Sequence, residues 1–594
     1  MKNSPRSLAA VFLSLTVAPA LPAQDSAAPR AAPPDPALRE PFIEANLSRP
    51  LITGRHGIVT SLHPLASMAG MKILLAGGNA FDAAVATALA VGVVDPKNST
   101  LGGQGFATLY VAAEKKVRAL NFFGPAPRAA TREAIGTRDY RSGYLSTPVP
   151  SNLRGYAALH AAHGRLPWRE VVQPALELAE HGFVVEEQFS QIVALLAKSL
   201  DYPGSRAVFF PQGRAPRTGE IFRQPDLART LRRIAEEGAD VFYRGDIARR
   251  IGDFYRAHDG LLAYEDLAAY EASWVEPVST TYRGYRIFAP PPNSSGLGVL
   301  LQLNILEGFD VSALGHNSPA HLHLMGEVHR LGIADRNRFV TDMSLTAVPV
   351  ERLLDKTYAV ERRKLLSLTA TMPSVAASSI ERGAELAPRS RENTTHLTVV
   401  DAAGNMVSLT QTLGAWFGSG VVAADTGVLF SNQMRHLHTD PASPSRLEPG
   451  RRPRSNQSPL IVLKDGQPWL ALGSPGSEGI WQRLVQVLVN VIDFKMDLQL
   501  AVSTPRLDYA GGAANLTLDP PAVFDLEDRL PPATFAALRA LGFKVTPTIS
   551  EGGSVNGVMR DPATHFLTGG ADPRRWSSEG EWWGPAVSVY GVGW

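Results

Sequence analysis

Apolar residues recur every three or four positions in three stretches of the chain, and each stretch lies next to Gly or Pro. This spacing predicts helices over residues 66–75, 80–93 and 168–180. Shorter runs with alternating apolar and polar residues predict strands. They cover residues 105–111, 285–289, 397–400, 405–412 and 460–463. Helices and strands are therefore mixed along the chain.

The N-terminus has the pattern of an export signal. Lys2 and Arg6 precede an apolar run, which ends in the small residues Ala18–Ala23. The alternative is a membrane anchor, but about ten apolar residues are too few for a bilayer that needs about 20. We therefore expect residues 1–23 to be a signal peptide and the protein to be exported, either periplasmic or secreted. Residues 24–50, rich in Ala and Pro, are expected to be a linker.

Composition excludes several kinds of chemistry. The 594 residues include no cysteine, so disulfides, thiolate metal sites and a Cys nucleophile are ruled out. The net charge of +2 comes from 58 basic and 56 acidic residues. Lys2 and Arg6 account for the surplus, since the first 23 residues hold no acid. The rest of the chain is neutral, which argues against broad binding to nucleic acid or anionic membranes.

Two candidate ligand sites are disfavoured. The cluster at Gly102, GGQG, lacks the residues of a phosphate-binding loop, so we expect a tight turn with close backbone approach. Four histidines crowd one region: His316, His321, His323 and His329. His321 and His323 cannot share a helical face, because neighbours on a face are three or four residues apart. We predict no metal and no cofactor.

The segment from Asn393 to Thr412 carries the candidate chemistry. It consists of two predicted strands joined by a turn at residues 401–404, after a charged run at 381–392 that predicts an exposed loop. A Thr hydroxyl is a weak nucleophile unless a base is adjacent, and an N-terminal Thr supplies its own α-amine. Thr394 would gain this amine if the Asn393–Thr394 bond were cut. From this segment alone, a plain hairpin with surface threonines remains the alternative.

The sequence NTTHLTVVDAAGN, residues 393–405, resembles the start of the small subunit of the γ-glutamyltransferases, which are N-terminal nucleophile hydrolases. Other segments resemble signatures of the same family in the same order. They are residues 77–106, 289–296, 334–339, 427–434, 473–479 and 569–575. The resemblance therefore extends over most of the chain after the linker.

This resemblance implies an α+β fold, a four-layer αββα sandwich made as one precursor. The precursor would cut itself into a large subunit, residues 51–393, and a small subunit, residues 394–594, which share one domain as a heterodimer. Thr394 would first attack the Asn393 carbonyl and later the γ-amide carbonyl of a glutathione-type substrate. Water would resolve the acyl-enzyme in hydrolysis, and an amino acid or peptide acceptor would resolve it in transfer.

The resemblance also assigns site residues. Gly476 and Ser477 match the Gly-Gly pair whose N–H groups form the oxyanion hole, and we expect the hole to survive if φ of Ser477 is negative. Thr412 matches a Thr that contacts the nucleophile, and Thr395 follows Thr394 as in the family. Further matches lie on the substrate's α-amino side, at Gln433, and on its α-carboxylate side, at Ser455 and Asn456. For the last two, a turn-forming role is the alternative.

Three polar groups of the family's substrate site are changed. Phe123 occupies the position of an Arg that pairs with the glutamyl α-carboxylate, a contact worth about 1.5–3 kcal/mol. His436 replaces an acidic residue for the α-amino group, and Gly414 replaces an Asn. The lid stretch, residues 438–450, is shorter than in relatives with a covered site, so we expect a more open pocket.

Three functions fit these observations. The first is a γ-glutamyltransferase or glutathione hydrolase in which Arg454 or Arg435 supplies the missing charge. The second is an amidohydrolase for another acyl group, as in the related cephalosporin acylases. The third is an exported binding or scaffold protein without turnover, which needs neither Thr394 nor the GSPG turn. The sequence favours the first.

Overall fold

The computed structural model describes residues 49–373, 375, 392–509, 522–548, 553–574 and 590–594. The predicted signal peptide, nearly all of the linker and residues 381–391 of the predicted loop lie outside these ranges. No helix within them is both long and apolar enough to cross a membrane.

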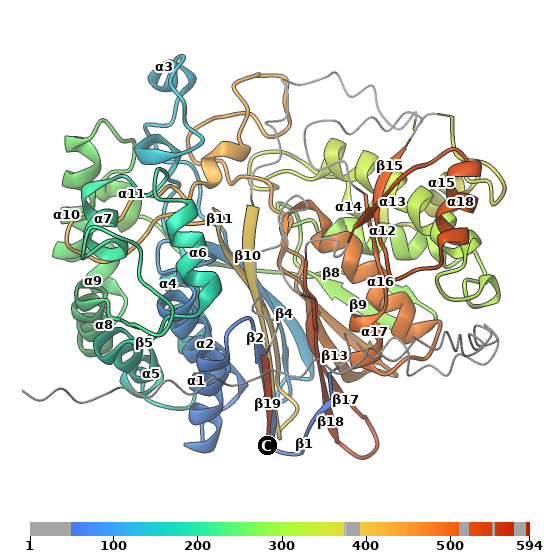
Figure 1. Ribbon diagram of the computed structural model, residues 1–594, viewed down its shortest axis with the longest axis horizontal. Coiled ribbons are helices and arrows are strands. Elements are labelled where there is room, and N and C mark those ends of the chain that lie inside the picture. The colour runs from blue at the N-terminus through green and yellow to red at the C-terminus, as the bar shows by residue number, and fades with distance from the viewer. Residues whose placement is uncertain (1–48, 374, 376–391, 510–521, 549–552, 575–589) are drawn as a thin grey trace, which may run out of the picture. The chain divides into compact units, whose positions relative to one another are not determined.

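Two antiparallel sheets of seven strands each form the centre of the fold (Figure 1). The first sheet has the order β19 (Tyr590–Gly593), β2 (Gly57–Ser61), β10 (Glu392–Asp401), β11 (Met406–Ala415), β3 (Gln104–Val111), β4 (Lys116–Phe122) and β7 (Ser273–Val275). The second has the order β1 (Ile52–Gly54), β18 (Leu567–Ala571), β17 (Asn556–Arg560), β13 (Gln467–Gly473), β12 (Leu460–Lys464), β9 (Tyr285–Ala289) and β8 (Val278–Tyr282).

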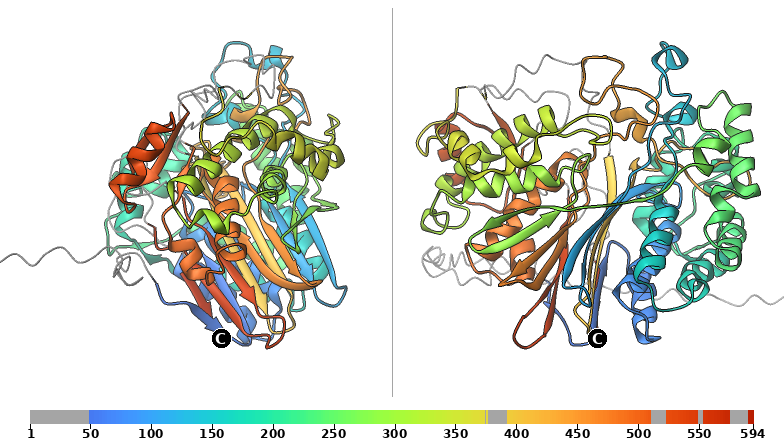
Figure 2. Two further views of the ribbon diagram at one scale, coloured as in Figure 1. Left: turned by 90° about the vertical axis from the view of Figure 1, so that its right-hand side faces the viewer. Right: turned by 180° about the vertical axis from the view of Figure 1, so that it is seen from behind.

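Helices cover the outer face of each sheet, as Figures 1 and 2 show. On the first sheet lie α1 (Pro64–Leu75), α2 (Ala80–Val94) and α4 (Asn152–His163), with α5 (Trp168–His181) and α8 (Pro225–Glu237) outside them. On the second lie α12 (Gly296–Leu306), α16 (Ile480–Ile492) and α17 (Leu498–Ser503), with α13 (Pro319–Phe339) packed on α12. The four layers are those of an αββα sandwich, which confirms the predicted fold.

Smaller elements complete the described chain. The remaining helices are α3 (Arg132–Ile135), α6 (Glu187–Leu195), α7 (Pro203–Phe209), α9 (Asp240–Tyr243), α10 (Asp246–Ala257), α11 (Tyr264–Ala268), α14 (Val350–Leu354), α15 (Lys356–Arg363) and α18 (Pro532–Ala540). A small sheet joins β14 (Leu507–Asp508), β15 (Val523–Glu527) and β16 (Lys544–Thr548), and a second pairs β5 (Phe183–Val184) with β6 (Ile221–Phe222).

The predicted periodic segments are confirmed as α1, α2, α5, β3, β9, β10, β11 and β12. Because successive side chains of β10 point to opposite faces, the strand contacts both the helical layer and the second sheet. Leu397 and Val399 join the apolar core under the helices, whereas His396 and Thr398 face the second sheet. His396 bonds to Thr410 at 2.8 Å and Thr398 at 3.0 Å, and burial lowers its pKa to about 3. A neutral polar seam therefore lies between the sheets behind residue 394.

The two predicted subunits alternate within one sheet. Strand β10, which begins next to the predicted cut, pairs with β2 from before the cut and with β11 from after it. Strand β11 in turn pairs with β3, which again precedes the cut. Shared backbone hydrogen bonds and a shared apolar core would therefore hold two cut pieces together.

We predict that the two pieces of the cut protein stay associated in native buffer. Size-exclusion chromatography should give one peak that contains both, and denaturant should be needed to separate them. Pieces that elute separately in native buffer would contradict the interleaved sheet.

Candidate active site

Thr394 lies at the start of β10, where the strand leaves regular pairing. The register with β11 shifts between Asn393 and Thr395, and such irregularities re-aim a side chain. The Thr394 Oγ1 donates to Thr412 Oγ1 at 3.4 Å, and Thr412 Oγ1 donates to the carbonyl oxygen of Asn393 at 2.5 Å. The N–H of Gly414 donates to Thr412 Oγ1 at 2.8 Å and fixes its position. The hydroxyl of Thr412 thus polarises the carbonyl that precedes Thr394.

The turn of Gly476 and Ser477 follows β13 and leads into α16. Ser477 lines the same pocket as Thr394. Gly476 has φ of +100° and Ser477 has φ of +55°, so the condition of a negative φ for Ser477 is not met. A left-handed conformation costs a non-glycine residue on the order of 1 kcal/mol but keeps its N–H group. Successive N–H groups in such turns form anion-binding concavities, so the turn retains the form of an oxyanion hole.

One pocket brings together most of the predicted substrate residues. It is lined by Thr394, Thr412, Gly414, Gln433, His436, Arg454, Ser455, Asn456, Gln457, Ser477 and Ile480. In the uncut chain it leaves only about 10 Å³, room for about one water molecule. The expected open pocket is therefore not found in the uncut chain, in which the Asn393 carbonyl accepts a hydrogen bond from the hydroxyl of Thr412.

Phe123 lies outside the pocket around Thr394. Its ring is fully buried and stacks on Phe106 at 5.3 Å between ring centroids, and it is not one of the residues that line the pocket. Its carbonyl oxygen accepts a hydrogen bond from Arg452 Nε at 3.1 Å. Packing against another aromatic ring in the core accounts for this placement, so the assignment of Phe123 to substrate binding is not supported by the geometry.

The charge of the pocket is positive. None of the described residues that line it is Asp or Glu, whereas Arg454 and His436 are among them. The neighbouring acid, Glu478, forms a 2.6 Å ion pair with Arg336, which is buried and also donates to Asn456. Burial favours the neutral acid, but Arg336, Arg454 and His436 outweigh it and hold the pKa of Glu478 below its ordinary value. Glu478 is thus an anion already surrounded by cations.

Residues 293–295 hold the loop that carries Ser455 and Asn456, a role the sequence did not reveal. Ser294 Oγ donates to the carbonyl of Gln457 and Ser295 Oγ to that of Ser455, each at 2.7 Å. Asn293 Nδ2 donates to the carbonyl of Pro453 at 2.7 Å. Small polar residues between a strand and a helix were the available signal. Ser455 and Asn456 therefore both form a turn and line the pocket.

Gly414 has a structural reason to lack a side chain. Its φ is +98°, and a Cβ there would overlap the side-chain oxygen of Asn432. That oxygen accepts a hydrogen bond from the N–H of Ala415 at 3.0 Å. An Asn at this position, as in the family pattern, would displace Asn432.

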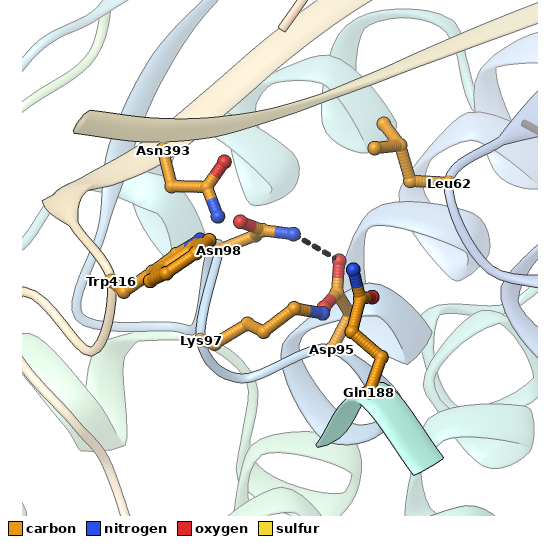
Figure 3. Close-up of a pocket in the computed structure, with 7 residues that line it drawn as sticks. All are labelled: Leu62, Asp95, Lys97, Asn98, Gln188, Asn393 and Trp416. Carbon is orange, nitrogen blue, oxygen red and sulfur yellow. Dashed lines mark hydrogen bonds and ion pairs between the residues drawn. The ribbon is translucent and has the colours of Figure 1, made fainter. Parts of the chain in front are cut away.

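Asn393 lies against a second, charged pocket (Figure 3). This pocket is lined by Leu62, Asp95, Lys97, Asn98, Gln188, Asn393 and Trp416. Lys97 and Asp95 form a buried ion pair, and Asn98 donates to Asp95 at 2.6 Å. The carbonyls of Lys97 and Asn98 accept from the N–H groups of Phe417 and Leu413. Residues before the cut thus support the residues around the scissile bond from behind.

A threonine at the start of an inner strand, in a sandwich of two sheets, with a left-handed turn that places Ser477 in the same pocket, defines the class of N-terminal nucleophile hydrolases. The chain belongs to the γ-glutamyltranspeptidase family, since the family model "Gamma-glutamyltranspeptidase" matches residues 66–582.

Relatives of two kinds resemble it at similar levels. The Acylase ACY 1 proenzyme of Pseudomonas sp. strain SE83 is 38% identical over 87% of this chain and 92% of the relative. The glutathione hydrolase proenzyme of Escherichia coli K12 is 34% identical over 92% of this chain and 94% of the relative. The crystal structure of cephalosporin acylase from Bacillus halodurans superposes with a TM-score of 0.81 at 33% identity, covering 92% of this chain and 97% of that one.

We predict that Thr412→Val slows the cut at Asn393–Thr394 by about 10²- to 10³-fold, the usual loss when a donor to a developing oxyanion is removed. A time course on denaturing electrophoresis after synthesis measures it. Ser408→Ala is the control, because that buried hydroxyl of β11 bonds to the Leu472 carbonyl instead. Cutting of Thr412→Val at the wild-type rate would contradict the role of Thr412.

Proposed function

We propose that the protein is an exported, self-cleaving amide hydrolase with Thr394 as its nucleophile. The observation that carries this proposal is the chain of hydroxyls from Thr394 through Thr412 to the Asn393 carbonyl. Thr394 Oγ1 adds to that carbonyl carbon, the C–N bond breaks, and the proton moves to the departing Thr394 nitrogen. Water then hydrolyses the resulting ester, which leaves an Asn393 carboxylate and a free Thr394 α-amine.

Turnover follows the cut and uses the amine it releases. The α-amine accepts the Thr394 hydroxyl proton as the oxygen attacks a substrate amide, and it returns a proton to the leaving amine. The N–H groups of Gly476 and Ser477 stabilise the oxyanion. The hydrogen bond from Thr412 to the Asn393 carbonyl supports this order, because in the uncut chain the hydroxyl next to Thr394 is already engaged with that carbonyl.

We propose that the acyl group carries a carboxylate and no ammonium group, as a glutaryl group does. Arg454 and His436 line the pocket, and the neighbouring acid, Glu478, is paired with Arg336 and lies close enough to both cations for them to lower its pKa. A cationic lining attracts a carboxylate and repels an ammonium group. The similarity to acylase proenzymes supports this proposal.

The second candidate is γ-glutamyl transfer and hydrolysis of glutathione-type amides, with amino acids or peptides as acceptors. It is favoured by Gln433 and Ser455, which line the pocket and match the residues on the two sides of the glutamyl head group. The similarity to glutathione hydrolase proenzymes supports it. The two candidates share the acyl-enzyme chemistry and differ in the charge they require of the substrate.

We predict that the cut enzyme hydrolyses glutaryl p-nitroanilide with a kcat/KM at least about tenfold above that for γ-glutamyl p-nitroanilide. The γ-glutamyl compound brings an ammonium group into a cationic pocket, and a loss of about 1.4 kcal/mol in binding free energy lowers kcat/KM tenfold. Release of p-nitroaniline measures both. A preference for the γ-glutamyl compound would favour the second candidate instead.

We predict that Arg454→Leu lowers kcat/KM for glutaryl p-nitroanilide about 10- to 100-fold, mainly through KM, because a charge-assisted bond worth about 1.5–3 kcal/mol is lost. Butyryl p-nitroanilide, which has no carboxylate, should be affected less than about threefold, within about 0.6 kcal/mol. Arg435→Leu is the control, because Arg435 does not line the pocket. Equal losses on both anilides would contradict carboxylate binding by Arg454.

A further inference from the structure

The turn that forms the oxyanion hole is held by a buried arginine that the chemistry above does not use. Arg483 lies in the first turn of α16 and is 2% exposed. Its Nη1 donates to the carbonyl oxygen of Gly476 at 2.7 Å and to that of Pro475 at 3.2 Å. Its Nη2 lies 3.4 Å from the carboxylate of Asp508.

These bonds fix the direction of two N–H groups. In a trans peptide, the C=O and the N–H of one plane point in opposite directions. The carbonyl of Pro475 points to Arg483, so the N–H of Gly476 points away from it. The carbonyl of Gly476 also points to Arg483, so the N–H of Ser477 points away as well. Both N–H groups therefore leave the turn on the side opposite the guanidinium.

We propose that Arg483 is a positioning residue that aims the two oxyanion-hole N–H groups at the Thr394 acyl centre. The inference rests on the proposed acyl-enzyme chemistry and adds a residue to it. Arg483 does not touch the substrate; it acts through the peptide planes of residues 475–477.

The conformation of the turn explains why such a clamp is needed. Gly476 and Ser477 are both left-handed, and Ser477 carries a Cβ that disfavours this region. Such conformations persist only where the surrounding contacts over-determine them. Ser474 Oγ, whose one proton can be donated to either the Pro475 carbonyl at 2.8 Å or the Ser554 carbonyl at 2.7 Å, supplies a further restraint.

The guanidinium occupies a space shaped by two glycines. A Cβ on Gly553 would overlap the centre of the guanidinium, and a Cβ on Gly479 would overlap its Nη2. Backbone thus approaches the guanidinium from two segments far apart in sequence. Gly553→Ala is therefore a second way to displace Arg483, which leaves the arginine itself in the chain.

A merely structural role for Arg483 predicts a different outcome from a positioning role. In the uncut chain the carbonyl of Asn393 is polarised by Thr412. Self-cleavage therefore reports whether the fold around Thr394 is intact, whereas substrate turnover also depends on the turn.

The test compares Arg483→Met and Gly553→Ala with wild type and with Arg529→Met, a control arginine that pairs with Glu527. The cut fraction is measured by denaturing electrophoresis, and kcat and KM are measured separately on glutaryl and γ-glutamyl p-nitroanilides. We expect both variants to be cut as wild type. Their kcat should fall about 10²- to 10³-fold, with KM changed less than about threefold, because oxyanion bonds act in the transition state. Arg529→Met should retain wild-type kcat.

Fully cut variants with wild-type kcat would overturn the inference alone. Loss of the cut and of turnover together in both variants would also overturn it, in favour of a structural role. A cut wild-type protein that hydrolyses neither anilide would overturn the proposed function, and the inference with it.

Discussion

In the proposed cut enzyme, β10 begins at a broken peptide bond and still has to hold its first residue, Thr394, in place. Ordinary strand ends fray, but β10 pairs with β11 from Glu392 onward and with β2 from Thr398 onward, and the irregular register at residues 393–395 lies where Thr394 Oγ1 bonds to Thr412. The sandwich holds β10 in place in three ways. It provides antiparallel partner strands on both sides of β10, an apolar core under one face of the strand and a polar seam behind the other face.

Both parts of the chain, before and after the predicted cut, contribute residues to the site. Residues after the predicted cut supply the proposed nucleophile Thr394, the hydroxyl of Thr412 and the turn at Gly476. Residues before it supply support: Ser294 and Ser295 hold the loop that carries Ser455 and Asn456, and the Lys97–Asp95 pocket lies against Asn393. Arg336 spans both, since it comes from before the cut and neutralises Glu478 after it. Charge in the pocket is therefore set jointly by the two halves.

The fold was predictable where periodicity was strong. Helices α1, α2 and α5 and strands β3 and β9–β12 follow the pattern closely, because their apolar residues recur at helical or strand spacing and are buried; α2 and β3 are buried along their whole length. The cluster of Thr394, Thr412, Gln433 and Ser455 was also foreseen from matched motifs. The left-handed Ser477, the burial of Phe123 and the clamp by Arg483 were not. Each depends on contacts between segments far apart in the chain, which no local pattern encodes.

In the proposed mechanism, Thr394 becomes an N-terminal residue whose hydroxyl carries the acyl group. The most direct test of this mechanism is peptide mapping by mass spectrometry after brief reaction with a slowly hydrolysed carboxyacyl ester and acid quench. We expect a tryptic peptide of residues 394–435 that begins at Thr394 and carries one acyl group on that residue. An uncut peptide across Asn393–Thr394, or an acyl group on another residue, would contradict it.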